Sequence, residues 1–350
     1  MIADDAALAA FMPQVEIADR VAIDTEADSL HCYFEKLCLV QVSLPGLDEL
    51  IDPLAPLALA PFFRVVERKL IILHGADFDM RMLRRAGLQG DPEVFDTMIA
   101  SRLCGHTEFS LAALLKRFFN LELAKGSQKA NWARRPLTPV MLEYAVNDTR
   151  YLLELSAILE AELVRLGRLD WHRQMSERVV AATKTQRQRD PDAAWRITGS
   201  HELRGRSAAI LRALWNWRDG EARKLDRPAF HIMQNTGLIE NSRLLDAGHA
   251  PNLAHLRGGR LDRFHEAVTA VMALPETEWP QRGQAMFQRM TPDQEEAVRR
   301  IKQGRDAKAK ELELDPTLIA SKAVLEALVR DPEATKAQLL PWQAGLLGLT

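Results

Sequence analysis

One feature of the first 170 residues constrains the fold most strongly: apolar segments typical of strands come first, and apolar residues at helical spacing follow. Residues 20–75 contain four short apolar segments, RVAIDTEA, LCLVQVSL, DELID and KLIILH, separated by turn-forming pairs such as PG and DP. Short apolar segments between turns are typical of β-strands. Beyond residue 76 the apolar residues recur at helical spacing, in DFDMRMLRRAGL, FDTMIASRLCG, SLAALLKRFFN and a long segment at 138–167. Strands followed by helices predict an α/β domain in which helices flank a central sheet with mixed strand directions.

The remaining sequence predicts helical units joined by polar segments. A chain of 350 residues is long enough for two or three domains. KTQRQRDPDAAW at 184–195 is typical of a linker, and LPETEWPQRGQ at 274–284 interrupts a second helical pattern. We expect a first domain at 1–170, a linker at 171–200, an all-α helical domain at 201–278 and a further helical region at 285–350.

Composition and charge limit the possible classes of protein. No apolar run approaches the roughly 18 to 20 residues that span a bilayer, and the first residues lack the features of a signal peptide. Three cysteines without paired CxxC spacing favour free thiols, so we expect a cytoplasmic protein with no membrane partner, and a monomer by default. Residues 1–60 hold eleven acidic and two basic side chains, whereas residues 171–230 hold thirteen basic and seven acidic ones. This asymmetry suits a cation site followed by a phosphate-binding surface, although solvated surface charge is the other interpretation.

The first predicted strand runs into acidic residues. VAIDTEADSL begins as a buried strand and continues into Asp24 and Glu26, whose side chains should lie on one face because they are two residues apart. Packing gives no reason for two adjacent negative charges at the edge of a core. We interpret Asp28, the next alternate acid, as a surface residue.

Two of the predicted helices each place an acid on an apolar face. Asp148 lies within the apolar stripe of segment 138–167, with Tyr144 one turn before it. Asp79 is the polar member of the inward stripe of DFDMRMLRRAGL. Structural interpretations stay open for both acids: Asp148 could reach solvent or cap another element, and Asp79 could stabilise a helix N-terminus.

Local periodicity therefore directs four acids toward one interior: Asp24, Glu26, Asp79 and Asp148. Clustered carboxylates repel each other, and some become protonated unless a cation neutralises them. A site made only of oxygen ligands favours Mg²⁺ or Mn²⁺ over Zn²⁺. Two such ions about 4 Å apart commonly hydrolyse phosphodiesters. Tyr144, with an ordinary pKa of about 10, would orient the attacking water rather than act as a base.

The order and context of these residues resemble the three motifs of the DEDD 3′–5′ exonucleases. The motifs are DTE on the first strand, His74-x3-Phe78-Asp79, and Tyr144-x3-Asp148. The tyrosine four residues before the last Asp is typical of the DEDDy subclass. Within it the chain is similar to the ribonuclease D family, whose segment before the third motif resembles KGSQKANWARRPL here. ADSLHCYFEKLCLVQV, after DTE, is closer to some eukaryotic-type relatives, which leaves the substrate preference open.

The resemblance implies an RNase H-like exonuclease fold and assigns residue roles. It implies two divalent cations, Mg²⁺ or Mn²⁺, held by the four acids, with Tyr144 as a further catalytic residue. The implied substrate contacts are Thr25, His74, Phe78, Lys125, Gln128, Trp132 and Arg135. Two of these have an alternative role, because Trp132 could brace the loop before the last helix and His74 could be structural.

The helical unit near 201–275 resembles an HRDC domain, a small nucleic-acid-binding module. The cues are LRALWNWRDGEARKLDRPAF and IMQNTGLIENSRLL. Six basic residues could form a phosphate-contacting patch, although each could equally be a solvated side chain: Arg204, Arg206, Arg218, Arg223, Lys224 and Arg227. We expect region 285–350 to be a second HRDC-like unit.

Our leading hypothesis is a metal-dependent 3′–5′ exoribonuclease that trims single-stranded 3′ ends of RNA, notably tRNA precursors, and releases nucleoside 5′-monophosphates. A DNA exonuclease acting in repair is the first alternative, because the motifs do not encode the sugar. The second alternative is a non-catalytic RNA-binding protein on the same fold. The four acids and Tyr144 disfavour this second alternative, since a protein that only binds RNA has no need of a buried anionic cluster.

Overall fold

The computed structural model describes residues 1–123, 126–185, 190, 192–281 and 290–349, which divide into two units. The first unit comprises Met1–Ala27, Leu37–Thr185 and Arg289–Thr350. The second comprises Asp28–Lys36 and Gln186–Gln288. The first domain was expected to end at residue 170, which falls inside helix α8 (Leu169–Ala182) of the first unit. The predicted linker 184–195 includes residues 186–189 and 191, which lie outside the described residues.

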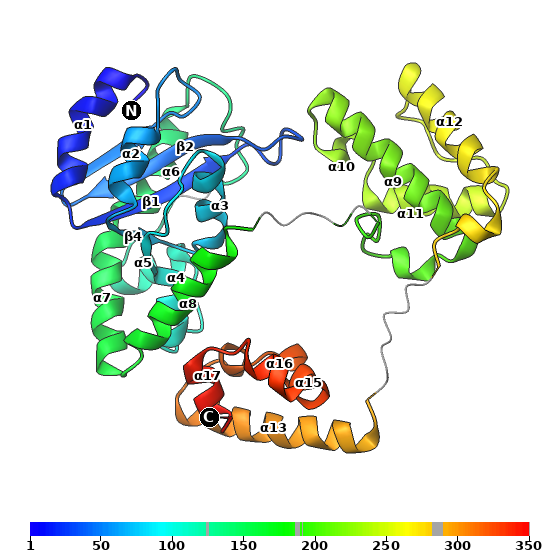
Figure 1. The fold of residues 1–350 in the computed structure, drawn as a ribbon. Helices are drawn as coiled ribbons and strands as arrows, with labels where there is room; N and C mark the ends of the chain where they lie inside the picture. Colours follow the sequence, from blue (N-terminus) through cyan, green and yellow to red (C-terminus); the bar gives the residue numbers. More distant parts are fainter. Residues whose placement is uncertain (124–125, 186–189, 191, 282–289, 350) are drawn as a thin grey trace. The chain divides into compact units, whose positions relative to one another are not determined.

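A mixed five-stranded sheet is the centre of the first unit (Figure 1). Its strands follow the order β3-β2-β1-β4-β5. The strands are β1 (Arg20–Ala27), β2 (Leu37–Leu44), β3 (Leu47–Ile51), β4 (Leu70–Leu73) and β5 (Glu93–Asp96). β1 pairs antiparallel with β2 and parallel with β4, while β2–β3 is antiparallel and β4–β5 is parallel. The predicted mixed sheet is confirmed. The prediction that Phe95 and Asp96 begin a helix is wrong, because both pair with β4.

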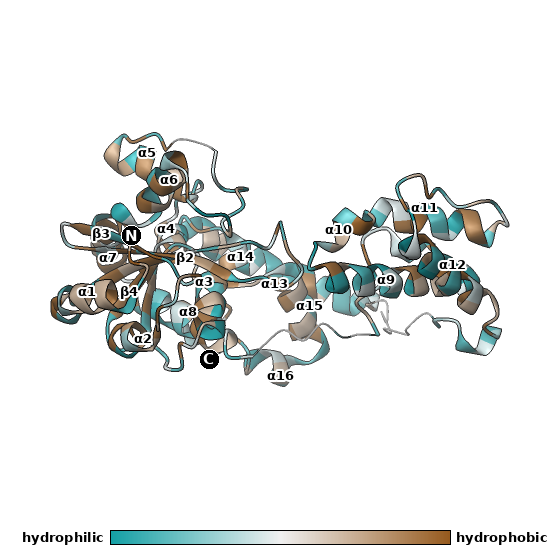
Figure 2. Ribbon diagram, turned by 90° about the horizontal axis from the view of Figure 1, so that it is seen from above, coloured by the Kyte–Doolittle hydropathy of each residue, from teal (hydrophilic) through white to brown (hydrophobic). Residues whose placement is uncertain are grey.

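Helices cover both faces of this sheet, and the alternation of each strand decides which face a residue joins. Val21 and Ile23 pack into one core, whereas Ala22 between them packs into the other. The first core takes in α1 (Asp5–Ile17), α2 (Ala60–Val66) and α3 (Asp77–Arg85). The second takes in α4 (Thr97–Leu103), α5 (Leu111–Phe119) and α7 (Leu152–Arg165). The strands are hydrophobic along much of their length, as expected for a sheet covered on both faces (Figure 2).

The long helical segment expected at 138–167 is two helices. α6 (Pro139–Arg150) begins at Thr138, whose hydroxyl accepts a hydrogen bond from the Met141 amide. It ends at Tyr151, where φ −101° and ψ 0° interrupt the helix before α7. Tyr144 and Asp148 therefore belong to α6, which packs on β2, β3 and β1.

The C-terminal helices belong to the first unit. They are α13 (Pro292–Glu311), α14 (Pro316–Ile319), α15 (Lys322–Arg330), α16 (Pro332–Lys336) and α17 (Pro341–Leu346). Trp342 stacks on Trp171 of α8 with ring centroids 4.7 Å apart. The Arg168 guanidinium donates 2.6 Å hydrogen bonds to the carbonyls of both Leu103 and Leu312. These contacts join the C-terminal helices to the sheet-containing unit, and a likeness of 285–350 to an HRDC domain stays a prediction.

The second unit is helical and is built around one long helix. Its elements are η1 (Ser200–Glu202), α9 (Gly205–Leu225), α10 (Ala229–Ile232), α11 (Asn235–Asp246), α12 (Gly259–Met272) and η2 (Glu276–Glu278). Trp217 of α9 meets Phe264 of α12 edge to face, with ring centroids 5.1 Å apart. No helix in the described part of either unit is both long and apolar enough to cross a bilayer.

The segment between β1 and β2 also belongs to the helical unit. The backbone amides of Tyr33 and Phe34 donate to the Asp226 carboxylate at 3.0 and 2.9 Å. The interpretation of Asp28 as a surface residue is wrong, because it is 2% exposed and accepts a 2.9 Å hydrogen bond from the Lys36 amide. Asp28 thus closes this segment on itself, a role that only the folded loop reveals.

Candidate active site

Three carboxylates from two elements meet in the first unit. Asp24 and Glu26 extend from the same face of β1, and Asp148 extends from α6. Each offers an oxygen, and these oxygens lie within 4.8 Å of one another. The strand alternation places the first two acids together, and the helical spacing directs the third toward them.

Asp79 reaches the site from the other face of the sheet. Thr25 lies between the two acids of β1 and points to the opposite side, where α3 carries Asp79. The Thr25 amide and hydroxyl donate to Asp79 Oδ1 at 3.0 and 2.6 Å. Asp79 is 4% exposed, and these two bonds fix its carboxylate against the strand that holds the other acids.

Burial and mutual repulsion raise the pKa of all four carboxyls. Burial raises the pKa of Asp24 well above its ordinary value, and the charges of Asp79, Asp148 and Glu26 raise it further. Burial and then the charges of Asp148 and Asp79 raise the pKa of Glu26 to about 8. Burial raises the pKa of Asp79 to about 7, despite the hydrogen bonds from Thr25. Burial and the charge of Asp79 raise the pKa of Asp148 to about 7.

Divalent cations fit this donor set. The four acids supply only oxygen ligands, which suit Mg²⁺ or Mn²⁺. Among the residues that the structure describes, no lysine or arginine forms an ion pair with any of them. A buried anionic cluster without an internal cation is stabilised when a cation binds from outside.

Two further side chains border the carboxylates. Gln41 lies opposite Asp24 in the β1–β2 ladder and donates to its Oδ2 at 3.3 Å. Sequence reasoning missed Gln41, although a glutamine on the neighbouring, mostly apolar strand was a usable signal. Tyr144 lies one turn before Asp148, and its ring centroid is 6.1 Å from that of Trp132.

The residues expected to contact substrate differ in how far their side chains are exposed to solvent. Phe78 is 45% exposed, which is unusual for a phenylalanine and leaves its ring accessible. His74 is half-buried, and its Nδ1 lies 2.9 Å from the Thr97 hydroxyl. Gln128 is exposed, whereas Lys125 lies outside the described residues.

Trp132 and Arg135 have structural surroundings. Trp132 is 1% exposed and packs beneath Tyr144, as a bracing residue would. The Arg135 guanidinium makes two 2.6 Å hydrogen bonds to Asp52 and donates a third, of 2.8 Å, to the Cys38 carbonyl. The structure thus gives Arg135 an internal ion pair, and its contact with substrate stays a prediction.

Sequence reasoning also missed Asp96, whose carboxylate binds the backbone of the turn at residues 75 and 76. Asp96, 2% exposed at the end of β5, accepts hydrogen bonds from the amides of Gly75 and Ala76 at 3.0 and 2.8 Å. It also caps α4 by accepting from the Met98 amide at 2.9 Å. An Asp directly before a helix was a signal for a cap, but the link to residues 75 and 76 arises only from the parallel pairing of β4 with β5.

Of the six residues expected to form a basic patch on the second unit, five are exposed and one is buried. Arg218 is 5% exposed, and its guanidinium donates to the Met233 carbonyl at 3.0 Å and to Asn235 Oδ1 at 2.7 Å. The expectation that Arg218 is a surface phosphate contact is therefore wrong, because its position on α9 faces the helical core. The other five are exposed: Arg204, Arg206, Arg223, Lys224 and Arg227.

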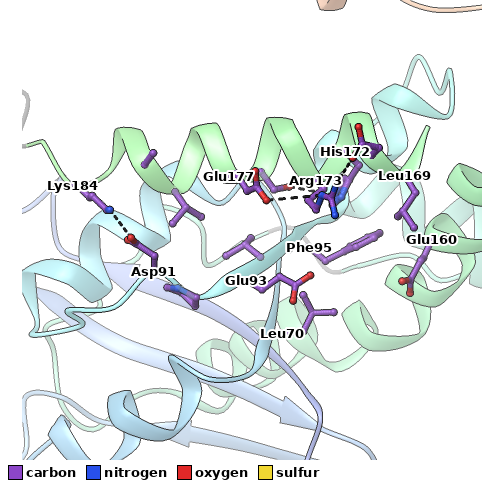
Figure 3. Close-up of a pocket in the computed structure, with 16 residues that line it drawn as sticks. Leu70, Asp91, Glu93, Phe95, Glu160, Leu169, His172, Arg173, Glu177 and Lys184 are labelled. Atoms are coloured by element: carbon purple, nitrogen blue, oxygen red, sulfur yellow. Dashed lines mark hydrogen bonds and ion pairs between the residues drawn. The ribbon is translucent and has the colours of Figure 1, made fainter. Parts of the chain in front are cut away.

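A large pocket elsewhere in the first unit is separate from this site. It has a volume of about 860 Å³ and lies among β5, α7 and α8 (Figure 3). Phe95, Glu93 and Glu160 line it, together with Lys184, which pairs with Asp91 at 2.5 Å. It shares no residue with the four carboxylates, so the size of a cavity does not locate the chemistry in this protein.

Comparison with known proteins shows the family to which this chain belongs. A family profile described as 3′-5′ exonuclease matches residues 1–164, and an HRDC domain profile matches residues 207–245. Ribonuclease D of Jannaschia sp. is 30% identical over 291 residues, which cover 78% of this chain and 74% of the relative. The chain belongs to the ribonuclease D family. That family consists of 3′–5′ exoribonucleases, so the chain is an enzyme of this class.

Two more relatives extend the likeness over nearly the whole chain. Ribonuclease D of Pseudomonas paraeruginosa is 28% identical over 339 residues, covering 94% of this chain and 89% of the relative. The crystal structure of Escherichia coli RNase D, described as an exoribonuclease involved in structured RNA processing, matches with a TM-score of 0.73. The match covers 99% of this chain and 96% of that one at 24% identity, which shows a shared fold.

Proposed function

We propose that this ribonuclease D family member is a metal-dependent enzyme that removes nucleotides from single-stranded 3′ ends of RNA, with tRNA precursors among its substrates. The observation that carries the proposal is the cluster of Asp24, Glu26 and Asp148, whose oxygens lie within 4.8 Å of one another. Family membership supports RNA as the substrate. We further propose a monomer in the cytoplasm, where the thiols of Cys32 and Cys38, which form no disulfide among the described residues, would stay reduced.

The reaction is the hydrolysis of the terminal phosphodiester. Asp24, Glu26 and Asp148, together with Asp79, would hold two Mg²⁺ or Mn²⁺ ions. When bound, such ions lower the pKa of an attacking water and stabilise the charge that develops on the departing oxygen. A bond forms between the water oxygen and phosphorus, and the bond to the 3′ oxygen of the preceding nucleotide breaks. The products are a nucleoside 5′-monophosphate and an RNA with a new 3′ hydroxyl.

Tyr144 acts in this scheme as a hydrogen-bonding group. Burial, followed by the charges of Asp148 and Glu26, raises the pKa of the Tyr144 hydroxyl, so it stays protonated at neutral pH. It can therefore orient the attacking water but cannot take its proton. Tyr144→Phe should lower the single-turnover hydrolysis rate by about 10- to 100-fold. The affinity for Mn²⁺, measured by calorimetry, should change little; an unchanged rate would contradict the assigned role.

The phosphate-contacting role of the second unit is part of the same proposal. Arg204 and Arg227 are exposed and form no ion pair among the residues that the structure describes. Such side chains can neutralise phosphates without reading sequence. Phe78, exposed next to Asp79, is suited to stack on a terminal base, a contact worth about 1 to 3 kcal/mol.

Matched oligonucleotides test the proposal. Single-stranded RNA and DNA of one sequence, labelled at the 3′ end, should be compared in Mg²⁺, in Mn²⁺ and in excess EDTA. We expect stepwise loss of 5′-monophosphates from RNA and no hydrolysis in EDTA. Faster hydrolysis of DNA would replace the RNA assignment, and activity in EDTA would overturn the metal mechanism. A tRNA with a 3′ extension, compared with a fully paired 3′ end, tests the substrate class.

A further inference from the structure

A second group of side chains of types that can bind a metal lies in the first unit and shares no residue with the four carboxylates. The Cys104 thiol, the His106 imidazole and the Glu162 carboxylate each offer one ligand atom, and these atoms lie within 4.8 Å of one another. We propose that Cys104, His106 and Glu162 bind a transition-metal ion, with Zn²⁺ as the ion that fits them best. None of the three residues takes part in the hydrolysis described above.

The end of α4 brings Cys104 and His106 together. The Gly105 and His106 amides donate to the carbonyls of Arg102 and Ser101, at 3.1 and 3.0 Å, and turn the chain back over the last turn of the helix. This turn needs a residue at φ +90°, which Gly105 provides. A Cβ at position 105 would lie 2.6 Å from the Glu313 carbonyl oxygen, so the C-terminal region leaves room there only for glycine.

Glu162 and His106 are oriented toward each other by their neighbours. Glu162 Oε1 lies 3.5 Å from the Arg165 guanidinium, while its Oε2 lies 3.2 Å from His106 Nε2. The His106 ring packs edge-on against Phe118, with ring centroids 5.6 Å apart. Each side chain is thus held by a contact that leaves one ligand atom directed into the group.

The spacing of these atoms suits a small tetrahedral ion. Zinc binds imidazole nitrogen and carboxylate oxygen at about 2.0 to 2.2 Å, which places two such ligands roughly 3.3 Å apart in a tetrahedron. The 3.2 Å between His106 Nε2 and Glu162 Oε2 is close to this separation. An ion pair with His106 protonated explains the same distance, and the Cys104 thiol then donates a long 3.9 Å hydrogen bond to the Leu159 carbonyl, whereas a metal would engage all three side chains.

The chemistry of the three ligands separates this site from the carboxylate site. Thiolate and imidazole select zinc and related ions, whereas oxygen ligands alone select Mg²⁺ or Mn²⁺. Three protein ligands leave a fourth position for water, and the Glu162 side chain is 24% exposed. The ion would link the turn after α4 to α7, next to the point where Arg168 bridges the Leu103 and Leu312 carbonyls. Its role would therefore be to stabilise the attachment of the C-terminal helices.

Cobalt titration of the full-length chain tests the site, because a thiolate–cobalt charge-transfer band reports only a cysteine ligand. The band should saturate at about one Co²⁺ per chain and disappear in Cys104→Ala. Excess Zn²⁺ should bleach it, since zinc binds such ligands more tightly. His106→Gln and Glu162→Gln should weaken Co²⁺ binding by at least about tenfold, as even supporting residues of metal sites do.

Matched cysteine variants keep the test decisive. Cys32→Ala and Cys38→Ala remove the other two thiols and should leave the band unchanged. Glu162→Gln leaves the thiol in place, so it tests the site even if Cys104→Ala does not fold by circular dichroism. The absence of a band in the folded wild type, or a band that survives in Cys104→Ala, would overturn the proposal. His106 and Glu162 would then be an ion pair only.

Discussion

The two units both bury carboxylates, but the pKa values of these carboxyls shift in opposite directions. In the sheet-containing unit, burial and mutual repulsion raise the pKa of Asp24, and the pKa of Glu26 reaches about 8. In the helical unit Glu221 is 3% exposed and accepts hydrogen bonds from Arg263 at 2.6 and 2.8 Å. The hydrogen bond from Arg263 holds the pKa of Glu221 below its ordinary value.

We propose that this difference separates a structural carboxylate from a functional one. A buried anion with an internal cation completes its own electrostatics, whereas clustered anions without one need a cation from outside. The rule does not depend on the unit, because Asp52 in the sheet-containing unit is paired with Arg135 at 2.6 Å. Pairing therefore distinguishes the two kinds of acid better than burial does.

The largest expected effect comes from removing one unpaired carboxylate. Asp24→Asn should lower kcat/KM on single-stranded RNA by at least about 1,000-fold, which corresponds to about 4 kcal/mol of transition-state stabilisation. It should also weaken Mn²⁺ binding, and it should raise the melting temperature without metal because one repulsive charge is gone. Asp91→Asn is the matched control: that acid is exposed and paired with Lys184, so activity should stay near wild type. Wild-type turnover of Asp24→Asn would sink the metal assignment.

Removing the paired carboxylate should damage stability instead. Glu221→Gln loses a charge-assisted hydrogen bond and should destabilise the helical unit by about 2 kcal/mol. The loss stays moderate because the Arg263 side chain is 41% exposed and can be solvated. Urea unfolding measures the effect, and Glu240→Gln, an exposed acid, should change stability by less than about 0.5 kcal/mol. A loss of hydrolysis in folded Glu221→Gln would mean that the two kinds of acid are not distinct.

Sequence periodicity was sufficient to predict the arrangement of the unpaired acids. Strand alternation put Asp24 beside Glu26, and the helical stripe directed Asp148 inward. The stripe of a second helix likewise directed Asp79 inward, but the way it is held needed tertiary information, because its hydrogen-bond donor Thr25 is 54 residues away in the chain. The local pattern thus indicates which acids are unusual, while the folded structure decides how they are held.

The elements that the sequence did not predict are short or depend on distant partners. α1 contains Pro13 and only a weak apolar stripe, so its periodicity did not suggest a helix. β5 has four residues and becomes a strand by pairing with β4. Asp28 and Arg218 are charged residues, which a local pattern places on the surface. Each is buried because it has a hydrogen-bond partner inside the fold: the Lys36 amide donates to Asp28, and Asn235 accepts from Arg218.

The pH dependence of stability provides a smaller test of the unpaired cluster. Because the carboxyl pKa values are raised in the folded protein, the protonated carboxyls contribute to the free energy of unfolding. This contribution is fully present below the ordinary carboxyl pKa of about 4, and it is lost as pH rises through about 7 to 8. Without metal, the melting temperature should fall on the order of 5 °C between about pH 6.5 and 9. Saturating Mg²⁺ should remove this fall, because it binds the deprotonated carboxylates. A metal-free melting temperature that rises over this range would contradict the raised pKa values.

The smallest expected effect concerns the arginines of the helical unit, which also divide, among the described residues, into unpaired and internally bonded side chains. Arg227 is exposed with no ion pair in the described part of the chain, whereas Arg218 is 5% exposed and donates to Met233 and Asn235. Arg227→Ala should weaken RNA binding slightly and reduce the slope of log K against log salt by at most about one. Arg218→Ala should lower stability and leave that slope unchanged, because a buried guanidinium releases no counterion when RNA binds. Fluorescence anisotropy on one RNA at several salt concentrations measures both slopes. Equal slopes for wild type and Arg227→Ala would show that this exposed cation does not contact phosphate, which would leave Arg204 as the other unpaired candidate among the described residues.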